Sequence, residues 1–122
     1  MTEEAFQWRV FRAVLDPVIG SEQAGLRPVL VVSDEIMNEA LSIVTVLPLT
    51  SAKPGRNIYS TEVLLPAGVA GQPADSIVMA HQIRTISKQR LRGAYGSLDD
   101  PMLRQAVRAA MRLYLNLENW IH

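Results

Sequence analysis

The sequence predicts one small domain of mainly β structure, a strongly bent antiparallel sheet or barrel, sealed by a single C-terminal helix. Two patterns support this prediction. Short stretches rich in valine, isoleucine and threonine, typical of strands, recur between turns that contain proline or glycine over residues 8–86. From residue 98 onward, apolar residues recur at helical spacing instead. The 122 residues are the length of one domain, so residues 1–122 are expected to share one core.

The first two predicted strands flank a polar loop. Residues 8–15 alternate weakly between two faces and end at Asp16-Pro17, because proline cannot donate to a strand ladder. Residues 29–32 are continuously apolar, which is typical of a strand covered on both faces. The loop between them, residues 20–28, is bounded by glycine and carries a hydroxyl, a carboxylate, an amide and a guanidinium. Sites are commonly built at such junctions, although a solvated surface loop explains the same residues.

The middle of the chain alternates between strands and connections. Ser33 and Asp34 are expected to cap one short helical turn that reaches Asn38. Further strands are predicted over residues 42–49, 59–65, 76–80 and 82–86. Residues 52–58 and 66–75 are rich in proline and glycine and indicate connections. Thr50 and Ser51 therefore lie at the mouth of the third strand.

The C-terminal part carries the signals of an amphipathic helix. Asp99 and Asp100 lie at its expected N-terminus and Pro101 occupies the first turn. Its apolar stripe consists of Leu103, Val107, Ala110, Met111, Tyr114 and Leu117. A second stripe consists of Arg104, Arg108 and Arg112, and like charges at this spacing repel one another. We expect water or structural partners to satisfy these arginines, in preference to a ligand.

The composition is that of a folded globular protein and excludes several kinds of site. The chain is 48% hydrophobic and 20% charged, and it contains no cysteine, which excludes disulfides and thiolate metal sites. The two histidines, His81 and His122, are far apart, so we expect no metal and no cofactor. The start of the chain lacks a secretory pattern, and no stretch approaches the roughly 20 apolar residues of a membrane helix. We therefore expect a cytoplasmic protein without a membrane contact.

The charges are balanced overall but unevenly distributed. The formal net charge is zero, yet residues 1–50 carry three basic and seven acidic side chains, and residues 51–122 carry nine and five. If folding gathers Arg84, Lys88, Arg90 and Arg92 near Arg27, the protein offers a basic groove to an anionic polymer. Simple solvation of these charges is the alternative.

Three segments carry a family resemblance by their order and spacing. The first runs from Asp16-Pro17 through Gly20-Ser21-Glu22-Gln23-Ala24-Gly25 to Arg27-Pro28, the second is Pro48-Leu49-Thr50-Ser51, and the third is Gln82-Ile83-Arg84-Thr85-Ile86-Ser87-Lys88-Gln89-Arg90-Leu91. Together they resemble the MazF/PemK family of toxin endoribonucleases from type II toxin–antitoxin systems. The likeness covers residues 10–117.

This resemblance implies an SH3-like small barrel of the CcdB, PemK and MazF type that forms a homodimer. It implies metal-independent, sequence-specific cleavage of single-stranded RNA, mainly mRNA, by attack of the 2′-hydroxyl, which leaves a 2′,3′-cyclic phosphate and inhibits translation and growth. A cognate antitoxin with an acidic flexible segment would neutralise the protein. The resemblance assigns catalysis to Arg27 and Thr50, and RNA contact to Ser21, Glu22 and Gln23 and to Ser51 with the loop 53–57. We take Glu22 as a further catalytic candidate. The predicted substrate-binding residues are Ser21, Gln23, Ser51, Lys53, Arg56, Asn57, Gln82 and Arg84.

Metal-free RNA cleavage needs a base, an acid and donors for the charge that develops on the phosphate. The planar fork of Arg27 suits two phosphate oxygens, and Thr50 has a hydroxyl to donate, although strand propensity also explains a threonine there. Glu22 is a substrate contact or the base, and it would need partial desolvation, because an ordinary glutamate pKa of about 4.3 makes a weak base. His81 ranks behind it. The aromatic residues Trp8, Phe11 and Tyr59 either stack on bases or fill the core.

Two departures from the family pattern leave a second function open. Gln7, Trp8 and Arg9 stand where relatives usually have a basic residue, a glycine and an acid. Met79 and His81 stand where some relatives have an Arg-x-Asp pair. The alternative is a non-catalytic module on the same fold, directed at gyrase as in CcdB or restricted to RNA binding.

Overall fold

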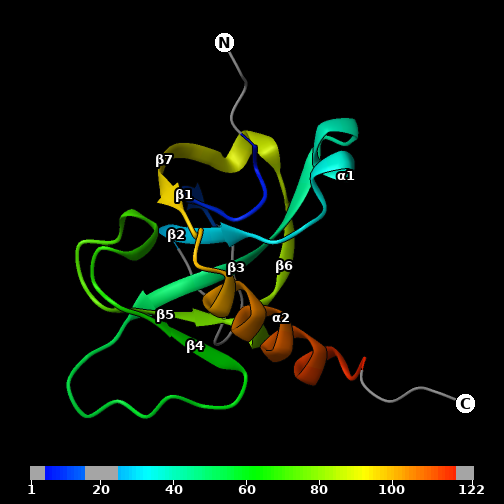
Figure 1. Cartoon of the computed structure of the whole chain (residues 1–122). Helices are drawn as coiled ribbons and strands as arrows, with labels where there is room; N and C mark the ends of the chain where they lie inside the picture. The colour runs from blue at the N-terminus through cyan, green and yellow to red at the C-terminus, as the bar shows by residue number, and fades with distance from the viewer. Residues whose placement is uncertain (1–4, 16–24, 118–122) are drawn as a thin grey trace, which may run out of the picture.

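A computed structural model describes residues 5–15 and 25–117. These residues form one antiparallel sheet system with two helices, joined by short 3-10 turns (Figure 1). The strands are β1 Arg9–Val14, β2 Leu26–Val31, β3 Ile43–Ser51, β4 Glu62–Leu65, β5 Ser76–Met79, β6 Arg84–Ser87 and β7 Leu91–Ser97. The helices are α1 Glu35–Ala40 and α2 Pro101–Leu115, and the 3-10 turns are η1 Val69–Gly71, η2 Ala80–Gln82 and η3 Lys88–Arg90. The predicted mainly β fold with a C-terminal helix is confirmed.

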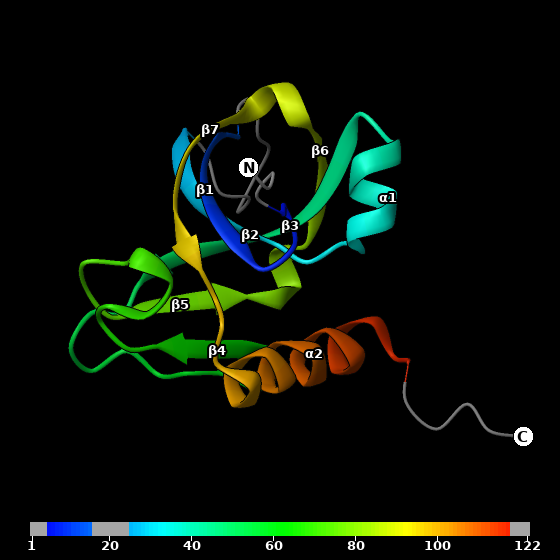
Figure 2. The same ribbon diagram turned by 45° about the horizontal axis from the view of Figure 1, so that its top comes forward.

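Strand β3 joins the two parts of the sheet. Its first half pairs with β6 and β2, whereas its last residues, Leu49, Thr50 and Ser51, pair with β5. The strand order is β4-β5-β3-β2-β1-β7, with β6 added on β3. Figure 2 shows β1, β2, β3, β6 and β7 curled around a common axis, while β4 and β5 extend to one side with α2 against them. The sheet is therefore strongly bent, as the sequence predicts.

The bent sheet separates two apolar clusters, which explains the continuous apolar run in β2. Leu30 packs in a cluster with Val10, Leu47 and the buried face of α2, whereas Val29 and Val31 pack on the opposite side of the strand. All three side chains are fully buried. A strand with a core on each face carries no polar alternation, and β2 was predicted on that basis.

Helix α2 begins and ends as its sequence signals indicate. The Asp100 carboxylate accepts hydrogen bonds from the backbone N–H groups of Met102 and Leu103, and Asn116 caps the C-terminus with a left-handed φ of 57°. Val107 and Ala110 are buried, but Tyr114 is 48% exposed. The predicted apolar stripe therefore packs only along part of the helix. Within the described residues, no helix is long and apolar enough to cross a membrane.

The arginine stripe of α2 meets an aromatic ring. The guanidinium carbons of Arg104 and Arg108 lie 5.3 and 5.0 Å from the ring centroid of Trp8, which is 5% exposed. Arg104 also donates from Nε to the Leu98 carbonyl at 2.6 Å. Two of the three arginines of the stripe thus have structural partners, and Arg112 is exposed. Of the aromatic residues considered for base stacking, Trp8 and Phe11 are buried, and Tyr59 is exposed.

Several strand bounds differ from the prediction, because β2 begins at Leu26 and β3 continues through Ser51. Two further differences have a physical cause. β4 begins at Glu62 and not at residue 59, because residues 59–61 form a turn in which the Glu62 N–H donates to the Tyr59 carbonyl at 2.9 Å. β7 was not predicted at all. Its glycines, Gly93 and Gly96, lower strand propensity, and residues 92–95 are all exposed, so no apolar face marks the strand. Its pairing with β1 is interrupted by register shifts, which further weakens any local signal.

Helix α1 anchors the start of β1 through a carboxylate. Glu35 accepts hydrogen bonds from the backbone N–H groups of Phe6 and Gln7 at 2.9–3.0 Å, and from the side chain of Asn38 at 3.2 Å. Burial would raise the Glu35 pKa, but these hydrogen bonds and the nearby charge of Lys88 outweigh it, so its pKa is lowered. The ionised carboxylate therefore stabilises the fold.

We expect this contribution to give stability a specific acid dependence. Because the folded pKa lies below the unfolded value of about 4.3, the stabilisation is complete above that pH and is lost as pH falls through the folded pKa. A Glu35→Gln variant should be less stable by about 1 to 2 kcal/mol at neutral pH, with a shallower loss toward acid. Urea unfolding from neutral pH to about pH 3 measures both quantities. Parallel pH curves for the two proteins would contradict the assignment.

Candidate active site

Of the predicted polar loop, residues 20–28, the structure describes only residues 25–28. Ser21, Glu22 and Gln23 lie outside the described residues. Arg27 is the second residue of β2 and pairs with Ala13 of β1. Its side chain is exposed. The described part of the candidate site therefore consists of Arg27 and residues of the strands beside it.

The pairing of β2 with β3 brings Arg27 toward Thr50. The register matches Val31 with Val46, Leu30 with Leu47 and Val29 with Pro48. Continued by two residues, the same register sets Arg27 across from Thr50. The two residues come from separate sequence segments, and the antiparallel pairing places them at the same end of β2 and β3.

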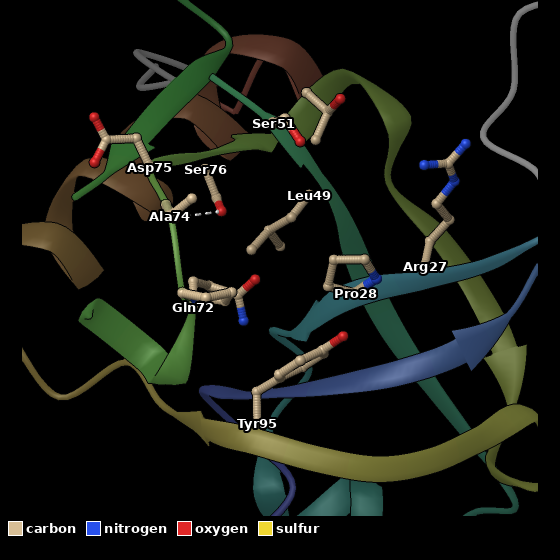
Figure 3. A pocket seen from close by; sticks show the side chains of 11 residues that line it. Arg27, Pro28, Leu49, Ser51, Gln72, Ala74, Asp75, Ser76 and Tyr95 are labelled. Atoms are coloured by element: carbon tan, nitrogen blue, oxygen red, sulfur yellow. Dashed lines mark hydrogen bonds between the residues drawn. The ribbon is translucent and has the colours of Figure 1, made fainter. Parts of the chain in front are cut away.

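Both residues line a pocket of about 190 Å³. Pro28, Leu49 and Ser51 also line it from β2 and β3, and residues 72–76 and Tyr95 complete it. Figure 3 shows Arg27 on one side of this pocket and Gln72 on the other, with the Tyr95 hydroxyl directed toward Pro28. The pocket thus combines a guanidinium, hydroxyl groups and an aromatic ring at an accessible surface. Such a combination suits a phosphate and an unpaired base.

The wall formed by Gln72 and Tyr95 was missed from the sequence. Gly71 has a φ of 74°, and a Cβ at this position would collide with the backbone carbonyl of Tyr95. A Cβ on Gly96 would lie 3.0 Å from the backbone of Ala70 and Gly71. The turn η1 and the strand β7 therefore meet backbone to backbone, which only glycine permits. In the sequence these glycines indicate only a connection, because the approach joins segments that are distant along the chain.

Two of the expected cations gather where β1 ends. Arg84 donates to the Leu15 carbonyl at 3.4 Å and Arg90 to the Val14 carbonyl at 3.0 Å. Val14 pairs with Leu26, the neighbour of Arg27. Both arginines therefore bind the chain next to Ala13, the strand partner of Arg27, and the basic groove itself stays a prediction. Lys88 instead lies 4.9 Å from the ring centroid of Phe6.

The other predicted contact residues lie in different settings. Lys53 and Asn57 are exposed in the connection between β3 and β4, and Gln82 ends η2. Arg56 is partly exposed, and its guanidinium forms an ion pair with Glu62 at 2.9 Å. The described residues contain no group of three His, Asp or Glu side chains that could hold a metal ion.

His81 and Asp75, two further titratable residues near these strands, are engaged elsewhere. His81 Nδ1 lies 3.0 Å from the Thr61 hydroxyl, and His81 is not among the residues that line the pocket. The Asp75 carboxylate lines the pocket but accepts the Ala67 N–H at 2.8 Å, and in Figure 3 it points away from Arg27. In the structure, neither residue is therefore positioned to transfer a proton to or from a substrate held beside Arg27.

Comparison with known proteins gives this pocket its context. Residues 6–115 match the family described as PemK-like, MazF-like toxin of type II toxin-antitoxin system. The chain belongs to this family. Endoribonuclease EndoA of Bacillus subtilis is 40% identical over 77% of this chain and 80% of its own length. Endoribonuclease MazF9 of Mycobacterium tuberculosis is 35% identical over 88% of this chain and 93% of its own.

The fold agrees with solved structures. Mycobacterium tuberculosis toxin MazF-mt6 superposes with a TM-score of 0.73 at 27% sequence identity, over 91% of this chain and 99% of its own. An endoribonuclease from a mycobacterial species, solved in complex with its cognate antitoxin, superposes with a TM-score of 0.76. It covers 97% of this chain and 100% of its own, at 24% sequence identity. The predicted family and the predicted CcdB/PemK/MazF-type fold are confirmed.

Proposed function

We propose that this PemK-like, MazF-like toxin cleaves single-stranded RNA without a metal ion, and that Arg27 and Thr50 act on the scissile phosphate. The enzyme class rests on the family and on two endoribonuclease relatives that match most of both chains. The observation that supports the residue assignment is the shared pocket. Arg27 and Thr50, predicted from separate motifs, line the same cavity at the edge of β2 and β3.

In the proposed reaction, the 2′-oxygen attacks phosphorus and the bond to the 5′-oxygen breaks. The products are a 2′,3′-cyclic phosphate and a free 5′-hydroxyl. A base takes the proton of the 2′-hydroxyl, and an acid supplies one to the leaving oxygen. The fork of Arg27 donates to two non-bridging oxygens, and Thr50 donates its hydroxyl to the same phosphate, so charge that develops there is stabilised. Glu22 remains our candidate for the base.

RNA would continue from the pocket over the neighbouring polar residues. We assign substrate contacts to Ser21, Gln23, Ser51, Lys53, Asn57, Gln82 and Arg84. The exposed phenol ring of Tyr95 at the pocket adds a surface on which a base can stack. Cleavage of mRNA would inhibit translation and growth, which places the protein's action in the cytoplasm.

The proposed partners follow from the family. A relative of similar fold has been solved with its cognate antitoxin, and we propose that an antitoxin with an acidic flexible segment neutralises this protein. Complementarity between such a segment and the arginines at the end of β1 supports this. We also propose a homodimer. The non-catalytic alternative, gyrase-directed or RNA-binding only, is not favoured, because the curated relatives are endoribonucleases.

Incubation of the purified protein with a long single-stranded RNA in EDTA tests this proposal. We expect cuts at a short recurring sequence that leave 2′,3′-cyclic phosphate ends, and mapping these ends also identifies the recognised motif. The matched control is an Arg27→Ala/Thr50→Ala double variant, which should bind RNA but not cut it. No cutting by the wild type, or equal cutting by the double variant, would refute the assignment. Binding of RNA or gyrase without cleavage would favour the alternative.

A further inference from the structure

Residues 52–61 connect the strand that carries Thr50 to β4, and the structure holds both of their ends firmly. At the start, the Ala52 N–H donates to the Asp75 carbonyl at 3.1 Å, next to the pairing of Ser51 with Ser76. At the end, Glu62 enters β4 and pairs with Met79 of β5. The connection thus leaves and rejoins the same pair of strands beside the pocket.

One ion pair joins the middle of this connection to the first residue of β4. Arg56 donates from Nη1 and Nη2 to the two carboxylate oxygens of Glu62, at 3.0 and 2.9 Å. This is the bidentate geometry in which guanidinium and carboxylate interact most strongly. The Glu62 side chain is only 1% exposed, whereas that of Arg56 is 29% exposed. A buried carboxylate needs such partners, because an unpaired charge at this site is costly.

The same two side chains also bind the backbone of the connection. Arg56 Nη1 donates to the Asn57 carbonyl at 2.6 Å, and the Tyr59 N–H donates to Glu62 Oε1 at 3.0 Å. The Arg56 N–H in turn donates to the Lys53 carbonyl at 3.1 Å. The hydrogen bond from Arg56 is the main cause that lowers the Glu62 pKa, although burial opposes it. The carboxylate therefore stays ionised and keeps its partners at neutral pH.

From this geometry we propose that Arg56 and Glu62 form a positioning latch, which fixes the path of residues 52–61 so that Lys53 and Asn57 face the RNA. Arg56 was predicted as a substrate contact from the sequence. The structure assigns it an internal partner instead, because its fork is occupied by Glu62 and Asn57. The role of the latch in RNA binding rests on the proposed endoribonuclease function. The ordering of residues 52–61 by the latch is independent of that function.

The ordering is tested without RNA. Hydrogen exchange at the amides of Arg56, Tyr59 and Glu62 should be protected in the wild type. A Glu62→Gln variant, which lacks the carboxylate charge, and an Arg56→Gln variant should both lose protection at these amides by about tenfold, while β3 and β5 keep theirs. Unchanged exchange in both variants would overturn the latch.

RNA binding separates a latch from a direct phosphate contact. The probe is a short labelled single-stranded RNA of mixed sequence with 2′-O-methyl groups, which cannot be cleaved because the nucleophile is blocked. A latch predicts that Arg56→Gln and Glu62→Gln each weaken binding several-fold, and that the double variant is no weaker than the poorer single variant. The salt dependence of binding should not change. On cleavable RNA, KM should rise while kcat stays constant.

A direct contact predicts a different pattern. Arg56→Gln alone would weaken binding and reduce the salt slope by about 0.7, the value for one phosphate contact on a single strand, and Glu62→Gln would leave binding unchanged or tighter. That result would overturn the proposal. Arg112→Gln is the matched control, because it removes one exposed arginine from the last turn of α2. It should change none of these quantities.

If Glu62→Gln fails to fold, Arg56→Lys decides the question. A lysine keeps the charge but cannot form the bidentate pair. The latch predicts that Lys and Gln at position 56 weaken RNA binding alike, with the wild-type salt slope, whereas a phosphate contact predicts that Lys retains the slope and Gln does not. If the wild-type protein binds no RNA, the proposed function fails together with the RNA-facing part of the latch. The exchange measurements still decide whether the pair orders the connection.

Discussion

Arg27→Lys should lower kcat for RNA cleavage by about a hundred- to a thousand-fold, the range found when one preorganised donor to a developing oxyanion is removed. The lysine keeps the positive charge, so binding of the RNA should change little. It loses the planar fork, whose fixed geometry matches two phosphate oxygens at once. Single-turnover cleavage of a mapped site, with RNA affinity measured separately, distinguishes the two effects. Arg27 is exposed, so the fold should be intact.

A second variant in the same pocket provides the comparison. Thr50→Val removes the hydroxyl at nearly constant volume and should lower kcat by about ten- to a hundred-fold, as expected for one hydrogen bond to a charged group. Because both side chains are assigned to one phosphate, the double variant should lose less than the product of the two effects. Wild-type kcat with unchanged RNA affinity in Arg27→Lys would show that Arg27 acts only as a charge. A loss confined to RNA affinity would show that its fork binds RNA without acting on the scissile phosphate.

The parts of the fold that were predictable are those with local causes. The N-cap at Asp100 with Pro101, the cap at Asp34 and the doubly buried β2 each follow from a few adjacent residues. Arg27 and Thr50 were predicted from motifs, and strand pairing then brought them to one pocket. These predictions needed no knowledge of distant contacts.

The missed features have distant causes. β7 is held by its pairing with β1 and by its close approach to η1, and its glycines lower every local signal for a strand. Gln72 and Tyr95 reach the pocket only through that approach. Arg56 lies in a polar connection that contains proline and glycine, and this setting predicts a solvated cation. Its ion pair with Glu62 depends on the turn at residues 59–61. Tertiary contacts decide these positions.

Trp8 is a different case, because both the family pattern and the backbone geometry favour glycine at this position. The resemblance to the MazF/PemK family implies a glycine at the position of Trp8. The backbone there has a φ of 69°, a left-handed conformation that costs a residue with a Cβ about 1 to 2 kcal/mol. The Trp8 N–H and carbonyl nevertheless bond to Val31 and Leu98 at 2.8 and 2.7 Å. The buried ring, covered by Arg104 and Arg108, offsets the strain.

Replacement of Trp8 should therefore destabilise the protein strongly, and the glycine variant should be more stable than the alanine variant. Trp8→Ala should lower the free energy of unfolding by about 3 to 5 kcal/mol, because it removes a buried ring but keeps the strained φ. Trp8→Gly should be more stable than Trp8→Ala by about 1 kcal/mol, since glycine adopts this φ freely. Urea unfolding of both variants measures the difference.

The matched control for this order is Phe11, which is also buried, lies within β1, and is not among the residues with a positive φ. At Phe11 the order should reverse, with the glycine variant less stable than the alanine variant by about 0.5 to 1 kcal/mol, because glycine loses more conformational entropy on folding. If glycine were the poorer substitution at both positions, backbone strain at Trp8 would be absent. The opposite orders would show that this chain exchanges a relaxed backbone at the start of β1 for a buried aromatic ring that holds two arginines of α2.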